Sequence, residues 1–417
     1  MQRFLVGLVV LLAGILLSRD AHVQKADQAF LDWLLRNTDP TPSKPLPLMV
    51  VEIGRSSQRT DKPAHPFIRG GSSEISPLEF ALFFQAIIEY KPTILAIEPV
   101  LRWRERDRDQ EQVFLDQAMR IPKLLLAAEL TATPDPDIPP PEITGFTHVS
   151  GRRGDLPTFT GIAHQPDEDL RLISTLAFTN LPEEVSSETH VPLLFQYRGD
   201  VIPAFALQAF LTWARIPMSE VNVVLGSHIG LPDGRKIPID SDGTLTVNPN
   251  AAKLGRHLNL NELLLLAQQR AKDSPLLQLP SDLLLARTPS IIKPDDPDQV
   301  REARSLGVLA AAIATLQSNR FIRRVSVVFD CVVLIGLAAL ASVASRVRQI
   351  DIILAAIALS AGYLLLAFGL VAHFGIFIPA VVPLSALWLL AIIALAAPRP
   401  KQHLAEPVEI VAAPPVP

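Results

Sequence analysis

The sequence lacks most of the residue patterns that carry chemistry. Its single cysteine, Cys331, lies inside an apolar stretch, so we expect no disulfide in the soluble part. No Gly-x-Ser-x-Gly, His-Glu-x-x-His, Walker-type or kinase-type motif occurs, and the 20 glycines are scattered and form no phosphate-binding loop. Lysine and arginine (38) nearly balance aspartate and glutamate (42), and there is no basic stripe. These absences predict a protein that is not an enzyme, holds no cofactor and binds no nucleic acid.

Acidic residues and histidine gather in two places without a recognised metal motif. His164 lies near Asp167, Glu168 and Asp169, but this spacing matches no zinc or EF-hand pattern. A polar turn is therefore preferred over a metal site. Residues 240–243 (DSDG) are also interpreted as a turn, because no glutamate follows at the position that completes a calcium loop. The sequence predicts no metal.

Long apolar runs are confined to the two ends of the chain. A helix needs about 20 apolar residues to cross a membrane, and three runs of that length lie near the C-terminus, after a shorter one at Phe4–Leu17. The three C-terminal runs are Val325–Ala344, Ile352–Val371 and Phe374–Ala397. The predicted parts are an N-terminal anchor in residues 1–21, a soluble domain in 22–324, three transmembrane helices in 325–397 and a Pro-rich tail in 398–417.

The short loops predict which side of the membrane holds the soluble domain. Lysine and arginine favour the cytoplasmic side, and they flank the predicted spans at Arg3, Arg346, Arg348, Arg399 and Lys401. The turn Ala372–His373 has neither and is expected outside. Arg320, Arg323 and Arg324 oppose this orientation but are outnumbered. No small-x-small cleavage pattern follows the first segment, so an uncleaved anchor is preferred over a cleaved signal peptide.

Three residues within the predicted spans have two interpretations each. Asp330 either marks a transport pathway or, as we prefer, pairs with the nearby arginines at the external end. Pro379 and Pro383 are expected to kink the fourth helix, either for signalling or for packing alone.

The first half of the soluble domain alternates between strand and helix patterns. Apolar runs that read as buried strands are separated by amphipathic segments with helix-start residues, such as Ser76-Pro77. The predicted order is a helix at 22–36, a strand at 46–53, a helix at 77–90, a strand at 93–97, a helix at 109–120 and a strand at 123–128. This spacing predicts βαβ units and a mostly parallel sheet in an α/β domain.

The second half has a mixed pattern. We expect strands at 192–197 and 221–225, a helix at 204–213, and hairpin turns at Asp233-Gly234 and Asp242-Gly243. A helix around 306–316 then leads back to the membrane. Residues 274–298 match no element.

Several segments together resemble the CHASE2 family of extracytoplasmic sensory domains of bacterial signalling proteins. The matching stretches, in order along the chain, are Asp27–Arg36, Val50–Ile53, Pro66–Arg69, Ala96–Leu101, Gly161–His164 with Asp167–Arg171, Pro203–Ala209 and Ile237–Gly243. Three transmembrane helices after the sensor are also typical of this family. The resemblance covers about residues 20–397.

The chain departs from the family pattern at several of these positions. Glu52 and Glu98 stand where aspartate is usual, and Leu170 replaces a glycine. Arg287–Asp298 replaces the usual stretch before the last helix. Family members commonly continue into an output domain such as a nucleotide cyclase or a histidine kinase. Because this sequence stops at Pro417, the resemblance implies a separate signalling partner.

A ligand site is expected where the first strands end. Glu52 and Glu98 follow two candidate strands that we expect to be adjacent, and ligands bind at the carboxyl edge of open α/β sheets. With Arg69 and Arg171 they would form a polar pocket for a small ligand. The alternative is that the acids cap loops or pair structurally with these arginines.

The resemblance implies a sensor in the bacterial inner membrane whose large domain is periplasmic. It would bind an unknown small ligand or envelope stimulus and pass a helix shift through four spans to a separate output protein. Sensors often signal as homodimers, although no heptad seam here requires one. The alternatives are an envelope structural or assembly protein and, less favoured, a membrane transport component.

Overall fold

The computed structural model divides the chain into two compact units. It describes residues 16, 20–39, 46–53, 77–88, 90–103, 108–134, 143–181, 189–270, 283–287, 297–325, 329, 332–337 and 349–396. The large unit comprises residues 29–324 and 368–377, and the small unit comprises residues 1–28, 325–367 and 378–417. Two of the four boundaries between the units fall within helices, α2 (Ala21–Arg36) and α10 (Gln349–Phe374), and the other two follow residues 324 and 377.

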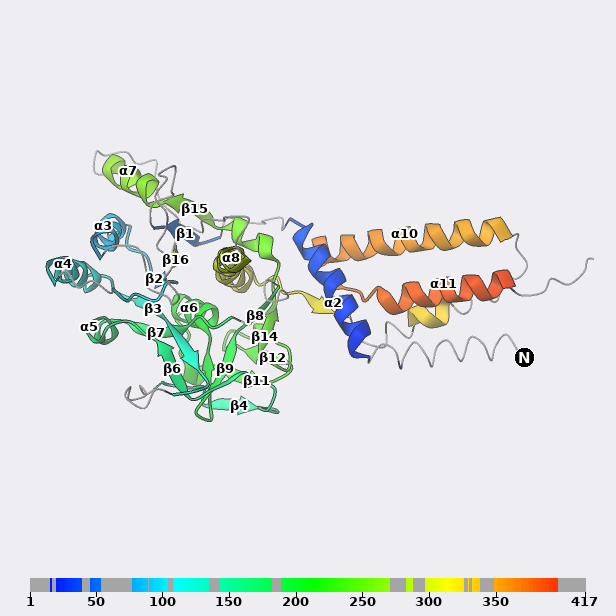
Figure 1. The fold of residues 1–417 in the computed structure, drawn as a ribbon, viewed down its shortest axis with the longest axis horizontal. Helices are drawn as coiled ribbons and strands as arrows, with labels where there is room; N and C mark the ends of the chain where they lie inside the picture. Colours follow the sequence, from blue (N-terminus) through cyan, green and yellow to red (C-terminus); the bar gives the residue numbers. More distant parts are fainter. Residues whose placement is uncertain are drawn as a thin grey trace, which may run out of the picture. The chain divides into compact units, whose positions relative to one another are not determined.

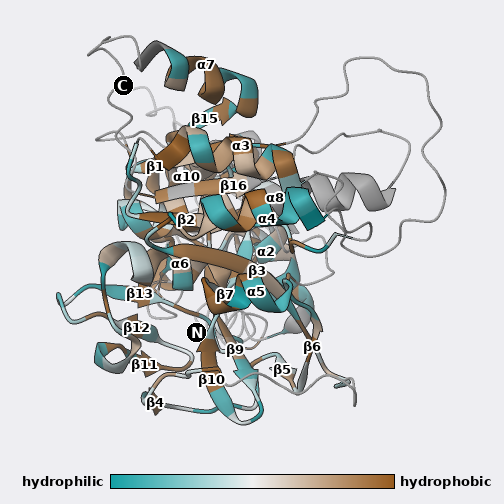
Figure 2. Cartoon of the chain, turned by 90° about the vertical axis from the view of Figure 1, so that its left-hand side faces the viewer, coloured by the Kyte–Doolittle hydropathy of each residue, from teal (hydrophilic) through white to brown (hydrophobic). Residues whose placement is uncertain are grey.

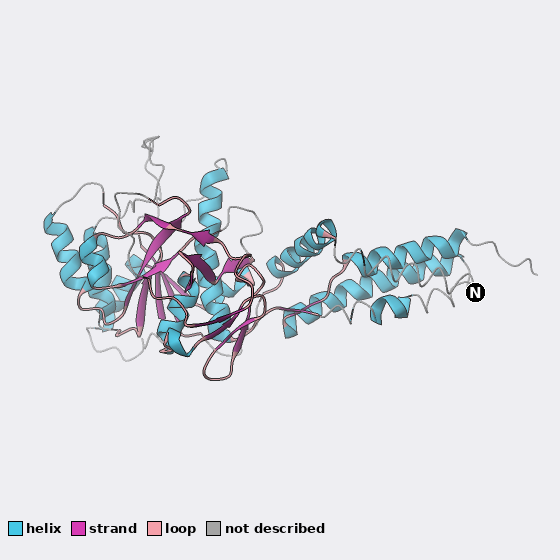
Figure 3. Ribbon diagram, turned by 90° about the horizontal axis from the view of Figure 1, so that it is seen from below, coloured by secondary structure: helices cyan, strands magenta, loops and turns pink. Residues whose placement is uncertain are grey.

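A mainly parallel seven-stranded sheet forms the centre of the large unit (Figures 1 and 3). Strands β15, β1, β16, β2 and β3 follow one another in that spatial order, and β7 and β6 both pair with β3. All pairs are parallel except β3 with β6. The strands are β1 (Leu48–Glu52), β2 (Ile94–Ile97), β3 (Leu124–Thr131), β6 (Gly161–His164), β7 (Thr175–Phe178), β15 (Arg256–Asn259) and β16 (Leu283–Arg287).

Helices cover both faces of this sheet. Met49 and Val51 of β1 pack in a cluster with residues of α3 (Pro77–Ile88), α4 (Arg108–Ala118), α5 (Glu168–Leu172) and α7 (Leu260–Arg270). Figure 2 looks onto this face, where strands β1, β2 and β3 are brown. Because side chains alternate along a strand, Leu48 and Val50 point to the other face. Burial on both faces explains why the strands read as continuous apolar runs.

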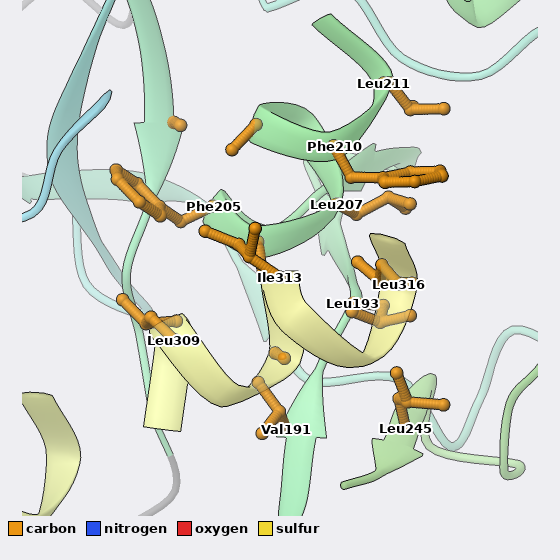
Figure 4. Close-up of a cluster of buried hydrophobic side chains, with 14 of the residues drawn as sticks. Val191, Leu193, Phe205, Leu207, Phe210, Leu211, Leu245, Leu309, Ile313 and Leu316 are labelled. Atoms are coloured by element: carbon orange, nitrogen blue, oxygen red, sulfur yellow. The ribbon is translucent and has the colours of Figure 1, made fainter. Parts of the chain in front are cut away.

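The opposite face is covered by α6 (Phe205–Ala214) and α8 (Pro297–Ser318). Figure 4 shows Phe205, Leu207 and Phe210 of α6 beside Leu309 and Ile313 of α8. All five side chains are buried. All side chains of α8 from residue 308 to 316 are buried, which anchors this helix in the core.

Four smaller sheets complete the described structure. Strands β4 (His148–Ser150), β11 (Asn222–Val224), β12 (His228–Gly230) and β13 (Lys236–Pro238) form one, and β5 (Thr158–Phe159), β9 (Leu194–Tyr197) and β10 (Asp200–Pro203) form another. Two pairs are β8 (His190–Pro192) with β14 (Thr244–Thr246) and β17 (Arg323–Arg324) with β18 (Ile376–Phe377). Two 3-10 helices, η2 (Met218–Glu220) and η3 (Pro249–Leu254), also occur.

The expected α/β class and parallel sheet are confirmed, but the strand order is not the expected one. Strand β16 lies between β1 and β2, pairing with both, so the two strands that carry the candidate site are not adjacent. β16 falls in the segment 274–298 that matched no element. Its sequence LLLAR is too short to distinguish a strand from a helix by periodicity.

A turn is present at Asp242-Gly243 as expected, but it does not join the neighbouring strands β13 and β14 into a hairpin. β14 pairs with β8, more than 50 residues earlier, and not with β13. The turn at Asp233-Gly234 does join β12 to β13 as expected. The local pattern could not show this pairing, because β8 lies far from β14 in the sequence.

The last two helices differ from the predicted third and fourth spans. Helix α10 continues through the predicted turn at 372–373 to Phe374, and the break lies at Gly375–Ala380. Helix α11 begins only at Val381 and ends at Ala396. The predicted kinks are therefore wrong: Pro379 precedes the helix and Pro383 lies in its first turn. Proline is tolerated there because those N–H groups have no partner within the helix.

One helix among the described residues is long and apolar enough to cross a membrane, namely Asp351–Phe374 of α10. The helix α11 is apolar but shorter. The predicted first span apart from Leu16, most of the predicted second span with Asp330 and Cys331, and the tail 398–417 lie outside the described residues.

Candidate functional site

The carboxyl edge of the central sheet carries the two predicted site glutamates. Glu52 is the last residue of β1 and is half-buried, whereas Glu98 directly follows β2 and is buried. Strand β16 ends between these two glutamates. Arg287 of β16 pairs in register with Glu52, and the Glu98 backbone N–H donates to the Ala286 carbonyl at 3.0 Å. The two glutamates therefore share one edge of the sheet but are separated by a strand.

The two predicted site arginines are not brought to this edge by the described structure. Arg69 lies outside the described residues. Arg171 is on α5, which leads into the amino end of β7, and β7 runs parallel to β3. The topology therefore places Arg171 towards the opposite end of the sheet from Glu52 and Glu98. The proposed four-residue pocket is not assembled by the residues that the structure describes.

Neither acidic cluster forms a metal site in the described part of the chain. No group of three or more His, Cys, Asp or Glu side chains there could hold a metal ion. His164 instead meets Glu129 of β3, with 2.7 Å between Nδ1 and the carboxylate. The Asp242 carboxylate accepts from the backbone N–H and the hydroxyl of Thr244, as expected for a polar turn.

A second candidate site lies where several distant segments of the large unit join. We call residues 29–39, 321–324 and 368–377 the junction. Its apolar centre contains Leu31, Leu34 and Leu35 of α2 with Val371 and Phe377. Strand β17 pairs in parallel with β18, and the Arg323 N–H donates to the Gly375 carbonyl at 2.8 Å. The segments that lead into and out of the α/β part are thus packed together.

Polar side chains attach the junction to the rest of the large unit. The Thr189 hydroxyl donates to the Asp32 carboxylate at 2.6 Å. The Asn250 amide donates to the carbonyls of Arg36 and Thr38 at 3.0 and 3.2 Å, and the Asn248 amide donates to Thr38 at 2.9 Å. These bonds satisfy carbonyls at the C-terminal end of α2, which have no partner within the helix.

Charged groups surround the attachment at Thr189. Asp240, in the turn before β14, is exposed, although nearby protein atoms partly desolvate its carboxyl group and raise its pKa. The nearby charges of His190 and Arg324 act in the opposite direction and lower this pKa. Residues of β8, β17 and the 240–243 turn therefore interact electrostatically.

A corresponding attachment exists within the small unit. The buried Asp27 carboxylate accepts from the backbone N–H groups of Ala380 and Val381, both at 3.0 Å. It thereby caps the N-terminus of α11, where negative charge is favourable. The Tyr363 hydroxyl donates to the Pro379 carbonyl at 2.6 Å. Two polar side chains thus hold the break between α10 and α11.

Sequence reasoning did not single out Asp32, Thr189, His190 or Asn250. Their hydrogen bonds join residues up to 215 positions apart in the sequence, and each is an ordinary polar residue in its own local pattern. Two of the family-like stretches carried a signal: residues 27–36 contain Asp32, and residues 237–243 contain Asp240.

The comparisons with known proteins do not assign this chain. No protein-family model, no curated protein and no solved structure matches it.

Proposed function

We propose that this chain is a membrane-anchored sensor whose large unit lies outside the cytoplasm and relays a stimulus to the small unit. The observation that carries the proposal is the junction. It joins α2, β17 and the end of α10 in one apolar cluster and is hydrogen-bonded to strands and turns of the α/β part. A displacement within the large unit therefore acts on α2 and α10 together, and both helices continue into the small unit.

The composition of the small unit supports a membrane location. The segment Asp351–Phe374 is strongly apolar, and most of its residues are not buried by the rest of the chain. The helix is thus neither a buried core helix nor an N-terminal signal. Large apolar side chains are exposed along it and along α11, including Leu365 at 72% and Ile392 at 58%. Such surfaces suit contact with lipid.

Relay requires two states of the protein with different affinity for the stimulus. The carboxyl edge with Glu52 and Glu98 is where we place the small ligand, because ligands bind at this edge of α/β sheets. The signal would pass from the small unit to a separate output protein in the bacterial inner membrane or the cytoplasm.

Hydrogen exchange of the full chain in lipid nanodiscs tests this function. We would add a panel of small metabolites and inorganic ions one at a time and follow two regions: the carboxyl edge and α11. The expected result is a compound that slows exchange near residues 52 and 98 and also changes exchange in 381–396. Glu52→Ala and Glu98→Ala should abolish both effects, while the exposed control Glu168→Ala should keep them.

Two outcomes would contradict the proposal. If no compound changes exchange in α11, the structural or assembly role is favoured instead. If a compound acts equally on Glu52→Ala and Glu98→Ala proteins that keep the wild-type melting temperature, the carboxyl edge is not its site.

A further inference from the structure

Three arginines that oppose the expected orientation lie where the apolar segment of α10 ends. Arg320, Arg323 and Arg324 are exposed. Strand β17 carries two of them, and Arg323 pairs in register with Ile376 of β18. The segment that is long and apolar enough to cross a membrane ends at Phe374. The arginines are therefore held at the level where this segment would leave the bilayer.

Close backbone packing fixes this position. The Arg323 N–H donates to the Gly375 carbonyl at 2.8 Å. Gly375 has a φ of +64°, and a Cβ atom there would lie 2.8 Å from the Phe321 carbonyl oxygen. Glycine is therefore needed at this position both for the backbone conformation and for the close approach. The arginine segment is thus packed directly against the end of α10.

Exposed aromatic rings lie on the same junction. Trp33 of α2 is 57% exposed and Phe374 is 70% exposed. Trp33 stacks on Phe30 with 6.3 Å between the ring centroids, and Phe30 lies 6.3 Å from Phe377. The Trp33 ring is thus anchored to the junction, but more than half of it is left uncovered by the described part of the chain. Tryptophan is enriched at membrane–water interfaces, where its ring meets an apolar and a polar environment together.

The exposed side of α2 within the large unit presents no carboxylate beside these groups. Trp33 and Arg36 are exposed there. Asp32 accepts from the Thr189 hydroxyl, so its charge is directed towards the α/β part. Asp39, beyond the end of the helix, pairs with a lysine of η3. The helix therefore has the basic and aromatic surface that is typical of helices lying at a membrane interface.

We infer that this part of the junction is a contact surface for anionic phospholipids of the leaflet in which α10 ends. The rings of Trp33 and Phe374 enter the boundary between acyl chains and headgroups, and the guanidinium groups of Arg320, Arg323 and Arg324 bind lipid phosphates. A free phosphate ion would satisfy the arginines but leave the aromatic rings in water, whereas a lipid accounts for both. The inference rests on the membrane location in the proposed function.

The inference also gives a role to charges that the orientation rule leaves unexplained. Arginine in a short segment on the external side is disfavoured, but a guanidinium group matches the geometry of phosphate oxygens. Lipids bound there hold the ends of α2 and α10 against the bilayer surface.

Fluorescence quenching of the full chain in lipid nanodiscs tests the contact of Trp33 with lipid. The probe is phosphatidylglycerol or phosphatidylcholine brominated near the headgroup end of its acyl chains. Trp388 is 41% exposed on α11, so the measurements use a Trp388→Phe background. Trp103 and Trp213 pack against phenylalanines of the α/β part and should not be quenched. Brominated lipid should quench the emission, and Trp33→Phe in the same background should abolish the quenching.

The preference between the two lipids tests the arginines. Brominated phosphatidylglycerol should quench Trp33 at a lower mole fraction than brominated phosphatidylcholine. Arg323→Gln should reduce this preference about fivefold, which corresponds to about 1 kcal/mol for one basic residue at an anionic surface. Arg323→Lys should retain most of the preference because the charge remains. The control Arg120→Gln should retain all of it, because Arg120 is exposed after α4, on the sheet face opposite α8.

Several results would overturn the inference. Quenching of Trp33 by aqueous iodide but not by brominated lipid would show that the ring faces water. Protection from both quenchers would show that a second copy or another protein covers it. Equal quenching by the two lipids, or an unchanged preference in Arg323→Gln, would show that the arginines do not select anionic lipid. If Arg323→Gln melts below the wild type, Arg320→Gln takes its place with the same expected reduction.

The same protein separates this inference from the proposed relay. Lipid quenching of Trp33 in a chain whose α11 responds to no compound contradicts only the relay. A compound response in α11 without lipid quenching of Trp33 contradicts only the lipid contact.

Discussion

Two turn glycines of the large unit share a left-handed backbone but differ in their surroundings. Gly243 has a φ of +77° and Gly234 a φ of +84°. A Cβ atom on Gly243 would lie 2.6 Å from Leu156 Cδ2 and 3.1 Å from Leu194 Cβ, whereas nothing lies within 4 Å of one on Gly234. The turn before β14 therefore needs glycine for its conformation and also for space.

We expect Gly243→Ala to destabilise the protein more than Gly234→Ala. Both substitutions place alanine in a left-handed conformation, at about 1–2 kcal/mol. Only Gly243→Ala adds overpacking against Leu156 and Leu194, at about 1–3 kcal/mol. Thermal melting of both variants in the same detergent measures the difference. Equal melting temperatures would show that the neighbouring side chains yield without cost.

At the scale of elements, the C-terminal end of α2 depends on side chains from η3. The Asn250 amide donates to carbonyls of residues 35, 36 and 38, and the Asn250 backbone N–H donates to the Asn248 side chain. The amphipathic pattern of α2 is visible in its own sequence, but the residues that cap its C-terminal end lie more than 200 positions away. The sequence predicted the helix and its end, and the tertiary structure supplied its cap.

Asn250→Ala is expected to loosen α2 at its C-terminal end. Removing the amide leaves helix carbonyls without their partner, at about 1–3 kcal/mol. Exchange of residues 33–39 should accelerate and the melting temperature should fall. The matched control is Asn222→Ala, an exposed position on β11. If both variants behave like the wild type, water replaces the amide at no cost and Asn250 does not hold the helix.

At the scale of the whole molecule, each unit has its own attachment to α2. Asp27 bonds within the small unit and Asp32 bonds within the large unit. The proposed relay requires both attachments, because a change that moves the helix must also reach α11. Loss of one attachment should therefore interrupt the signal while leaving the other unit responsive.

Asp27→Ala tests this requirement. It removes the cap of α11, at about 0.5–2 kcal/mol for a helix N-terminus. With an active compound as the stimulus, the change in exchange of residues 29–39 should remain, while that of 381–396 should be lost. Lys25→Ala, an exposed position on the same helix, should retain both. A response of α11 that survives in Asp27→Ala would mean that α2 does not carry the signal.

The sequence by itself determined the α/β class, most of the helices and the buried strands of the first half. These features follow from local periodicity, helix-start residues and continuous apolar runs, all of which are legible within a short window. The tertiary structure decided what local pattern cannot encode. It inserted β16 between β1 and β2, so that Glu52 and Glu98 are not on adjacent strands. It also gathered Asp32, Thr189, His190 and Asp240 at one attachment. Strand order and polar attachments depend on pairing between distant segments, and those pairs form only when the chain folds.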